Sequence, residues 1–203
     1  MATTPETKLT RPRVPAAERR DALIEATVHE FARAGLHGTP VDRIARRVGV
    51  AQPYVFSLFG SKRELFLAAV ERGSKLIAET FTGAAAAFQP DSAEPDLDVL
   101  RAMGYAYVGL LHSHRDYLML QHHSYAACDD PEIRGRVRAS YARLVIHVER
   151  LAREHSKRHG LPVPDGEQID EFFRYGMWLN VAAAMGVEDL SAGCEWVRAE
   201  RNK

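Results

Sequence analysis

Residues 39–62 read TPVDRIARRVGVAQPYVFSLFGSK, and this stretch decides the fold. Its first half has three apolar side chains on one face of a short helical pattern: Ile44, Ala45 and Val48. Gly49 then supplies a tight turn, because glycine adopts positive φ at no steric cost. A second pattern of about two turns covers residues 52–58, with Val55 and Phe59 facing inward. The stretch therefore predicts two short helices joined by a glycine turn, the layout of a helix-turn-helix.

The flanks of this stretch carry helix-start signals. We expect the Thr39 hydroxyl to cap the first helix, with Pro40 at its first position and Asp42 in its first turn. Further on, Ser61 and Glu64 form an S-x-x-E capping box, which predicts that another helix starts there.

The second short helix presents an outward face that packing does not explain, because it would expose two aromatic rings on a helix too short for a second core. Side chains of this kind can contact base edges, thymine methyls and phosphates. Lys62, in the first turn of the next helix, suits a phosphate. The predicted DNA-binding residues are Thr39, Arg43, Gln52, Pro53, Tyr54, Phe56, Ser57 and Lys62. The alternative is an ordinary helical hairpin with a polar face.

The stretch resembles the N-terminal DNA-binding domain of TetR-type transcriptional regulators over about residues 16–75. The matching residues are Phe31, Gly35, Ile44-Ala45, Gly49-Val50, Gln52-Pro53-Tyr54, Phe59 and Ser61-Lys62. Three positions depart from the family pattern: Ala51 replaces a capping Ser or Thr, Phe56 replaces a phosphate-bonding tyrosine, and Leu58 replaces an aromatic residue or histidine. Tyr54 would take over one of the lost backbone contacts.

The fold class expected is all-α: an N-terminal three-helix helix-turn-helix DNA-binding domain followed by a larger helical ligand-binding and dimerisation domain. We predict a flexible basic arm over residues 1–15 that is able to enter a minor groove, with a solvated tail as the alternative. Arg11, Arg13, Arg19 and Arg20 lie in this leader before or at the start of the first helix. The DNA-binding domain would cover residues 16–62 and the second domain residues 63–203. Formal charge supports this division: residues 1–62 carry ten Lys and Arg against six Asp and Glu, whereas residues 63–203 carry 17 against 21. The positive charge therefore lies where a phosphate backbone would bind.

Beyond residue 62 the apolar periodicity is helical throughout. It predicts helices over residues 64–87, 97–113, 115–127, 132–159, 166–185 and 188–201, with a linker over residues 89–96. Bulky and small side chains alternate in the 166–185 helix, which favours packing on more than one side. We expect this helix and the 132–159 helix to form a homodimer interface in which Asn180 fixes the register. The alternative is that both helices complete the core of one chain.

The middle helices are rich in large side chains with polar tips, which suit a pocket for an aromatic or amphipathic effector. The predicted ligand-binding residues are Tyr105, Tyr107, His112, Tyr117, Gln121, His122, Tyr125 and Trp178. The alternative is plain core packing with the polar tips at the surface. His112, His114, His122 and His123 crowd together but lack the spacing of a metal site, so we expect no metal.

The sequence therefore predicts a homodimeric regulator, a repressor that a small-molecule effector releases from a palindromic double-stranded DNA operator. No nucleophile elbow, phosphate loop or His-Glu-x-x-His string is present, so we expect neither an enzyme nor a cofactor. No apolar run is long enough to cross a membrane, so we expect no membrane partner and a cytoplasmic location. Cys128 and Cys194 are expected to be free thiols. Two alternatives remain: a helical small-molecule or metal sensor without specific DNA binding, and a regulator without an effector.

Overall fold

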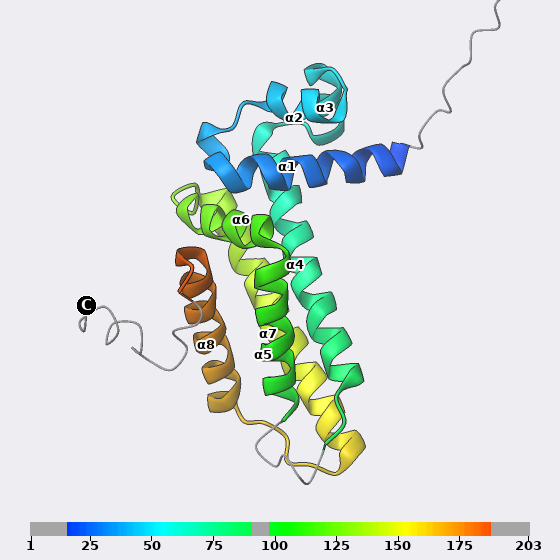
Figure 1. The fold of residues 1–203 in the computed structure, drawn as a ribbon, viewed down its shortest axis with the longest axis vertical. Helices are drawn as coiled ribbons and strands as arrows, with labels where there is room; N and C mark the ends of the chain where they lie inside the picture. Colours follow the sequence, from blue (N-terminus) through cyan, green and yellow to red (C-terminus); the bar gives the residue numbers. More distant parts are fainter. Residues whose placement is uncertain (1–15, 91–97, 188–203) are drawn as a thin grey trace, which may run out of the picture.

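The computed structural model describes residues 16–90 and 98–187, and within these ranges it contains eight helices and no strand (Figure 1). The helices are α1 (Ala16–Gly38), α2 (Val41–Val48), α3 (Gln52–Phe59), α4 (Lys62–Ala87), α5 (Val99–Ser113), α6 (Arg115–Ala126), α7 (Pro131–His159) and α8 (Gly166–Met185). The expected all-α fold is thereby confirmed. The predicted helix over 188–201, Cys194, the predicted arm over residues 1–15 and most of the 89–96 linker lie outside the described ranges.

Helices α1, α2 and α3 form a small head at one end of the molecule, and α1 runs across the long axis of α4 (Figure 1). The head has its own apolar core, in which the Phe31 and Phe66 rings meet edge to face with centroids 5.1 Å apart. Three residues from beyond α4 also join this core: Leu120, Ala127 and Ile133. The head is therefore packed onto the body, and the domain boundary at residue 62 stays a prediction.

Gly35 interrupts α1 with a kink, and the helix continues beyond it to Gly38. Its φ of 63° lies in the left-handed region that favours glycine. A Cβ atom at this position would also lie 2.8 Å from Nδ1 of His123 on α6. Glycine is therefore required here both by the backbone conformation and by the close approach of α6.

Thr39 does not cap α2, so that prediction is wrong. The N-cap residue is Pro40, and it makes no side-chain capping bond. The Thr39 hydroxyl instead donates to the carbonyl oxygens of Glu30 and Gly35, at 3.1 and 2.8 Å, and the residue is 1% exposed. Thr39 therefore ties the α1–α2 corner together.

Helices α4 to α8 form the elongated body around a second apolar cluster that includes Phe81, Met103 and Val148. The helix ends follow the sequence signals closely. The Asp130 carboxylate accepts from the amides of Glu132 and Ile133 at the start of α7, and Asp165 with Gln168 forms a complete capping box at the start of α8. Helix α8 has the predicted bounds, and the other body helices agree within two residues. Among the described helices, none is long and apolar enough to cross a membrane.

Candidate nucleic-acid interface and buried cavity

Helix α3 presents one face to the core and the opposite face to solvent. Val55 and Phe59 are buried, as predicted. The turn before it is set by Gly49 at φ 71°, and the Val50 amide donates to the Ala45 carbonyl at 3.0 Å. Four predicted DNA-contacting residues are exposed on the outer face: Gln52, Pro53, Phe56 and Ser57.

Tyr54 is half-buried, because its ring packs against the head core and lies under a cation from α1. The Arg19 guanidinium carbon is 5.8 Å from the centroid of the Tyr54 ring, and that of Arg20 is 4.9 Å from the Phe59 ring. Both arginines belong to α1 and clamp α3 against it, so their assignment to a flexible arm is wrong. Arg11 and Arg13 lie outside the described residues.

A buried carboxylate organises the basic side chains of α2. The Glu30 side chain is only 6% exposed and pairs with Arg43 at 3.6 Å and Arg47 at 3.2 Å, both of which remain about half exposed. Arg46 pairs with Asp42 at 2.8 Å along α2. Glu30 thus fixes Arg43 and Arg47 to the head while leaving their outer surfaces open.

The starts of α3 and α4 differ in how their amides are satisfied. Ala51 is the N-cap of α3 and offers no side-chain acceptor, whereas Ser61 Oγ accepts from the Glu64 amide at 3.1 Å at the start of α4. Lys62 Nζ donates to the His37 carbonyl at 3.2 Å, and partial burial lowers the pKa of this ammonium from its usual value. Lys62 therefore holds the end of α1 against α4 and keeps its cation near the first turn of α4.

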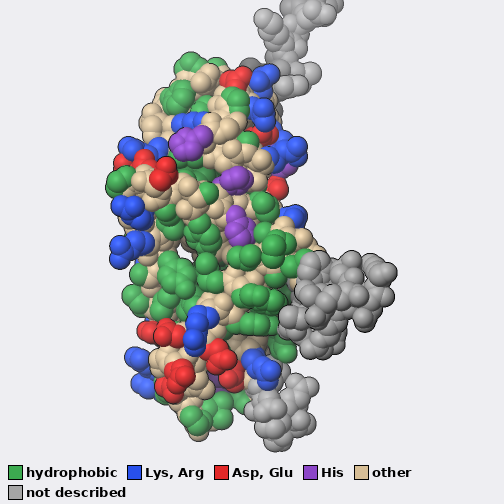
Figure 2. Space-filling view, turned by 90° about the vertical axis from the view of Figure 1, so that its left-hand side faces the viewer, with side chains coloured by type: hydrophobic (Ala, Val, Ile, Leu, Met, Phe, Trp, Pro, Cys, Tyr) green, Lys and Arg blue, Asp and Glu red, His purple; other side chains and the backbone are tan. Residues whose placement is uncertain are grey.

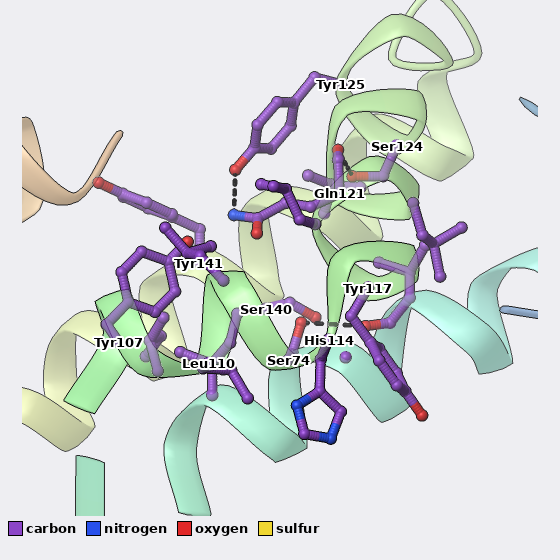
Figure 3. A pocket seen from close by; sticks show the side chains of 18 residues that line it. Ser74, Tyr107, Leu110, His114, Tyr117, Gln121, Ser124, Tyr125, Ser140 and Tyr141 are labelled. Atoms are coloured by element: carbon purple, nitrogen blue, oxygen red, sulfur yellow. Dashed lines mark hydrogen bonds between the residues drawn. The ribbon is translucent and has the colours of Figure 1, made fainter. Parts of the chain in front are cut away.

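A cavity lies in the body between α4, α5, α6 and α7 (Figure 3). Its volume is about 70 Å³, and a second hollow of about 60 Å³ extends it toward α8. The two hollows share five lining residues: Ile77, Tyr107, Gln121, Tyr141 and Leu144. Together they fall below the 300–1,000 Å³ typical of small-molecule pockets, so a ligand of ordinary size would have to displace side chains.

Several polar groups at this cavity have hydrogen-bond partners within the chain. Gln121 Nε2 donates to the Tyr125 hydroxyl at 2.6 Å, and Asn180 Nδ2 donates to the Tyr107 hydroxyl at 2.9 Å. The other amide atom of the buried Asn180, Oδ1, has no hydrogen-bond partner among the residues that the structure describes. Burial raises the pKa of Tyr107 and Tyr125, so both phenols stay neutral at physiological pH. Among the described lining residues of both hollows, none is a Lys, Arg, Asp or Glu.

The structure brings together half of the predicted ligand-binding residues. Tyr107, Tyr117, Gln121 and Tyr125 line the cavity. The other four residues lie elsewhere. Tyr105 and Trp178 are 66% and 41% exposed, and His112 is exposed with Nδ1 bonded to the Val108 carbonyl. His122 Nε2 bonds to the Asn180 carbonyl outside the lining. Tyr105, His112 and Trp178 occupy the outer faces of α5 and α8, whereas His122 is half-buried and directed from α6 toward α8.

Sequence reasoning missed α7 as a wall of the cavity and, on α8, named Trp178 in place of the residues that line it. Val137, Ser140, Tyr141 and Leu144 follow one another at helical spacing and face the cavity from α7, and Phe172 and Phe173 face it from α8. The same spacing was interpreted as a dimer interface. Asn180 likewise bonds within its own chain, so its predicted role in fixing a dimer register is wrong.

The outer face of α8 carries an exposed apolar stripe, which we call the α8 stripe and which consists of Tyr175, Trp178, Val181 and Met185. The rings of Tyr175 and Trp178 stack with centroids 5.8 Å apart. Figure 2 shows hydrophobic side chains gathered on the middle of this side of the body, while charged side chains dominate its lower end.

Within the described residues, no group of three or more His, Cys, Asp or Glu side chains is placed to hold a metal.

Comparison with known proteins agrees with the geometry of the head. Residues 23–69 match the family model of bacterial regulatory proteins of the tetR family. The HTH-type transcriptional activator FasR of Mycolicibacterium smegmatis is 42% identical over 60 residues, which are 30% of this chain and 27% of that protein. The HTH-type transcriptional repressor SCO4008 of Streptomyces coelicolor is 38% identical over 50 residues, 25% of this chain and 26% of that protein. The matches thus span about a quarter of the length of these curated relatives.

The likeness extends to the body at the level of fold. A TetR-like transcriptional regulator from Rhodococcus sp. RHA1 superposes with a TM-score of 0.56 and 24% identity, covering 89% of this chain and 88% of that one. The head thus resembles the DNA-binding domain of the tetR family over residues 23–69, and the described chain shares the fold of this solved regulator.

Proposed function

We propose that this protein is a sequence-specific DNA-binding regulator of transcription in which α3 contacts base edges in the major groove. The observation that carries the proposal is the outer face of α3. It exposes Gln52, Pro53, Phe56 and Ser57, although the same helix buries Val55 and Phe59. A glutamine near the start of a groove-facing helix can bond an adenine edge, and a proline or aromatic ring can contact thymine methyls.

The cations around α3 supply the contacts to phosphate in this proposal. Arg43 and Arg47 are held by Glu30 with their outer surfaces open, and Lys62 lies at the first turn of α4. Such contacts set position and affinity but carry no base information. Thr39 is left out of the proposed interface, because its hydroxyl is buried and bonded within the head.

We further propose that two chains associate through the α8 stripe and read a palindrome. One helix of eight residues contacts few base pairs, whereas a two-fold pair places two heads on successive half-sites. A stripe of four exposed apolar side chains is also costly to leave in water.

The proposed direction of control is repression relieved by an effector in the body cavity. SCO4008 is named a repressor and FasR an activator, so the two relatives do not decide between repression and activation for this chain. Helix α4 passes from the head into the cavity wall, contributing Val70, Gly73, Ser74 and Ile77, so a ligand that moves it would also move the head. A coupling free energy of about 1–3 kcal/mol would suffice.

Selection of duplexes from a random-sequence pool tests this function. We expect the wild type to enrich one palindromic sequence. Fluorescence anisotropy should show tight, steeply salt-dependent binding to it, with two chains per duplex by sedimentation. Gln52→Ala should relax base preference by about 1–3 kcal/mol at one position per half-site, whereas Arg43→Ala should weaken binding to all duplexes alike. Equal, weak binding of the wild type to every duplex would refute the proposal.

A further inference from the structure

Tyr117, near the start of α6, touches both the body cavity and the head. Its ring lines the cavity, and Figure 3 shows the ring leading away from the cavity toward its hydroxyl. That hydroxyl donates to Glu25 Oε1 on α1 at 2.7 Å. The same Glu25 oxygen pairs with Arg72 of α4 at 3.2 Å. One carboxylate of the head is therefore held by one group from α6 and one from α4.

The Tyr117 ring packs closely against Gly73 of α4. A Cβ atom at Gly73 would lie 3.1 Å from Tyr117 Cδ1 and 3.8 Å from Cε1. Glycine in the middle of a helix is normally unfavourable, so the close ring accounts for its presence in α4. By contrast, Gly83 on the same helix has no atom within 4 Å of the corresponding Cβ position.

Neighbouring contacts fix the same junction. Asp116 precedes Tyr117, and its Oδ2 lies 2.7 Å from His29 Nδ1 on α1. Burial and the bond to Glu25 raise the pKa of Tyr117 to about 12, so the phenol remains a neutral donor under physiological conditions. The first turn of α6 is thus bonded to α1 at two points one turn apart.

We propose that the Tyr117 ring is the junction through which occupancy of the cavity reaches the DNA-binding head. Added volume in the cavity beside Gly73 pushes the ring outward, separates its hydroxyl from Glu25, and loosens α1 from α6 and α4. The head then loses the orientation that binds DNA. This inference rests on the proposed function, of which it names the coupling residue. Tyr117 acts here as a positioning residue through Glu25, and it makes no contact with DNA.

The protein itself offers a substitute for the unidentified effector. Gly73→Ala adds one methyl group at the ring, in a helix where alanine is otherwise preferred, so the variant should fold. Gly83→Ala makes the same change in open space on the same helix and serves as the matched control. Tyr117→Ala removes the ring that the methyl group would strike, and the Gly73→Ala/Tyr117→Ala pair completes a double-mutant cycle.

Two measurements on the full chain compare the variants of this double-mutant cycle. Hydrogen exchange reports the α1 amides around residues 25–29 without DNA, and anisotropy reports affinity for the selected palindromic duplex. We expect Gly73→Ala to speed that exchange and weaken binding by about fivefold or more, the lower end of allosteric couplings, and Gly83→Ala to change neither. In the Tyr117→Ala background, the Gly73 change should have no further effect on either quantity.

The outcomes separate the junction from the DNA-binding function. If Gly73→Ala matches Gly83→Ala in both measurements, or has the same effect with and without the Tyr117 ring, the junction is wrong. If the wild type selects no duplex, the proposed function fails, and the exchange measurement alone decides whether Tyr117 connects the cavity to α1.

Discussion

At the scale of single residues, Thr39 and Glu30 show that part of the head's polar chemistry serves its structure. Thr39 closes the end of α1 with two hydrogen bonds, and Glu30 anchors two arginines of α2 from a nearly buried position. Both act on the α1–α2 corner, which sets the position of α3. Substitutions at these sites should therefore change stability first and DNA binding only as a consequence.

Thr39→Val provides the direct test. It keeps the shape of the side chain but removes the hydroxyl, leaving the Glu30 and Gly35 carbonyls without that donor. We expect a loss of about 1–3 kcal/mol in the free energy of unfolding, measured by urea denaturation. Thr39→Ser, which retains the hydroxyl, should lose much less. If Thr39→Val instead left stability unchanged and weakened DNA binding, Thr39 would be a DNA contact after all.

Residue roles were predictable where spacing alone decides them. Val55 and Phe59 had to face inward and Gln52 and Phe56 outward, because helical periodicity fixes the two faces of α3. The role of Thr39 was not predictable, because it depends on where the α1 carbonyls lie after the chain turns at Gly35. Likewise, the sequence groups Arg19 and Arg20 with the arm, because their aromatic partners on α3 are distant in sequence and meet them only in the folded chain.

At the scale of elements, α3 is short, begins without a side-chain cap and is held mainly by its two buried residues and the arginines of α1. Its first turn has no side-chain acceptor for its amides: Pro53 has no N–H, and the Tyr54 amide donates to the Ala51 carbonyl at 3.0 Å. This helix should be the least stable of the head in the absence of DNA.

Ala51→Ser is expected to correct that deficiency. Residue 51 is exposed and has the extended backbone conformation of an N-cap, with φ −78° and ψ 142°, so a serine hydroxyl can accept from the Tyr54 amide of α3. Stability should rise by about 0.5–2 kcal/mol in urea denaturation. Ala86→Ser, at an exposed position inside α4, offers no cap and should give no gain. An Ala51→Ser variant no more stable than wild type would show that the α3 start is already satisfied.

The helices were predictable from sequence, whereas only half of the predicted ligand-binding residues line the cavity. Capping residues such as Asp130 and Asp165 and the helical period marked the ends of α7 and α8. Which faces of these helices meet depends on their crossing angles, which periodicity does not give. For this reason Tyr105 and Trp178 were expected in the cavity and lie on the surface, while Ser140 and Tyr141 were not expected and line it.

At the scale of the whole molecule, α4 connects the two functions. Its 26 residues span ~39 Å, contribute Leu65 and Phe66 to the head core and Phe81 and Ala85 to the body core, and supply Gly73 and Arg72 at the junction with Tyr117. A displacement of α4 in the body would therefore be transmitted to α1 through the contacts of Arg72 and Tyr117 with Glu25. The formal charge of the chain follows the same division, because Lys and Arg are in excess over residues 1–62 and Asp and Glu over residues 63–203.

The central claim, that the outer face of α3 meets DNA, is tested most directly by site-specific photocrosslinking. Phe56→p-benzoylphenylalanine places the reactive ring on that face, and Val163→p-benzoylphenylalanine places it in the exposed loop between α7 and α8. We expect the Phe56 variant to crosslink to the selected duplex, with unlabelled selected duplex competing and scrambled duplex not competing, and the Val163 variant to give no crosslink. Equal crosslinking from both positions, or none from Phe56 under conditions where the duplex is bound, would contradict the claim.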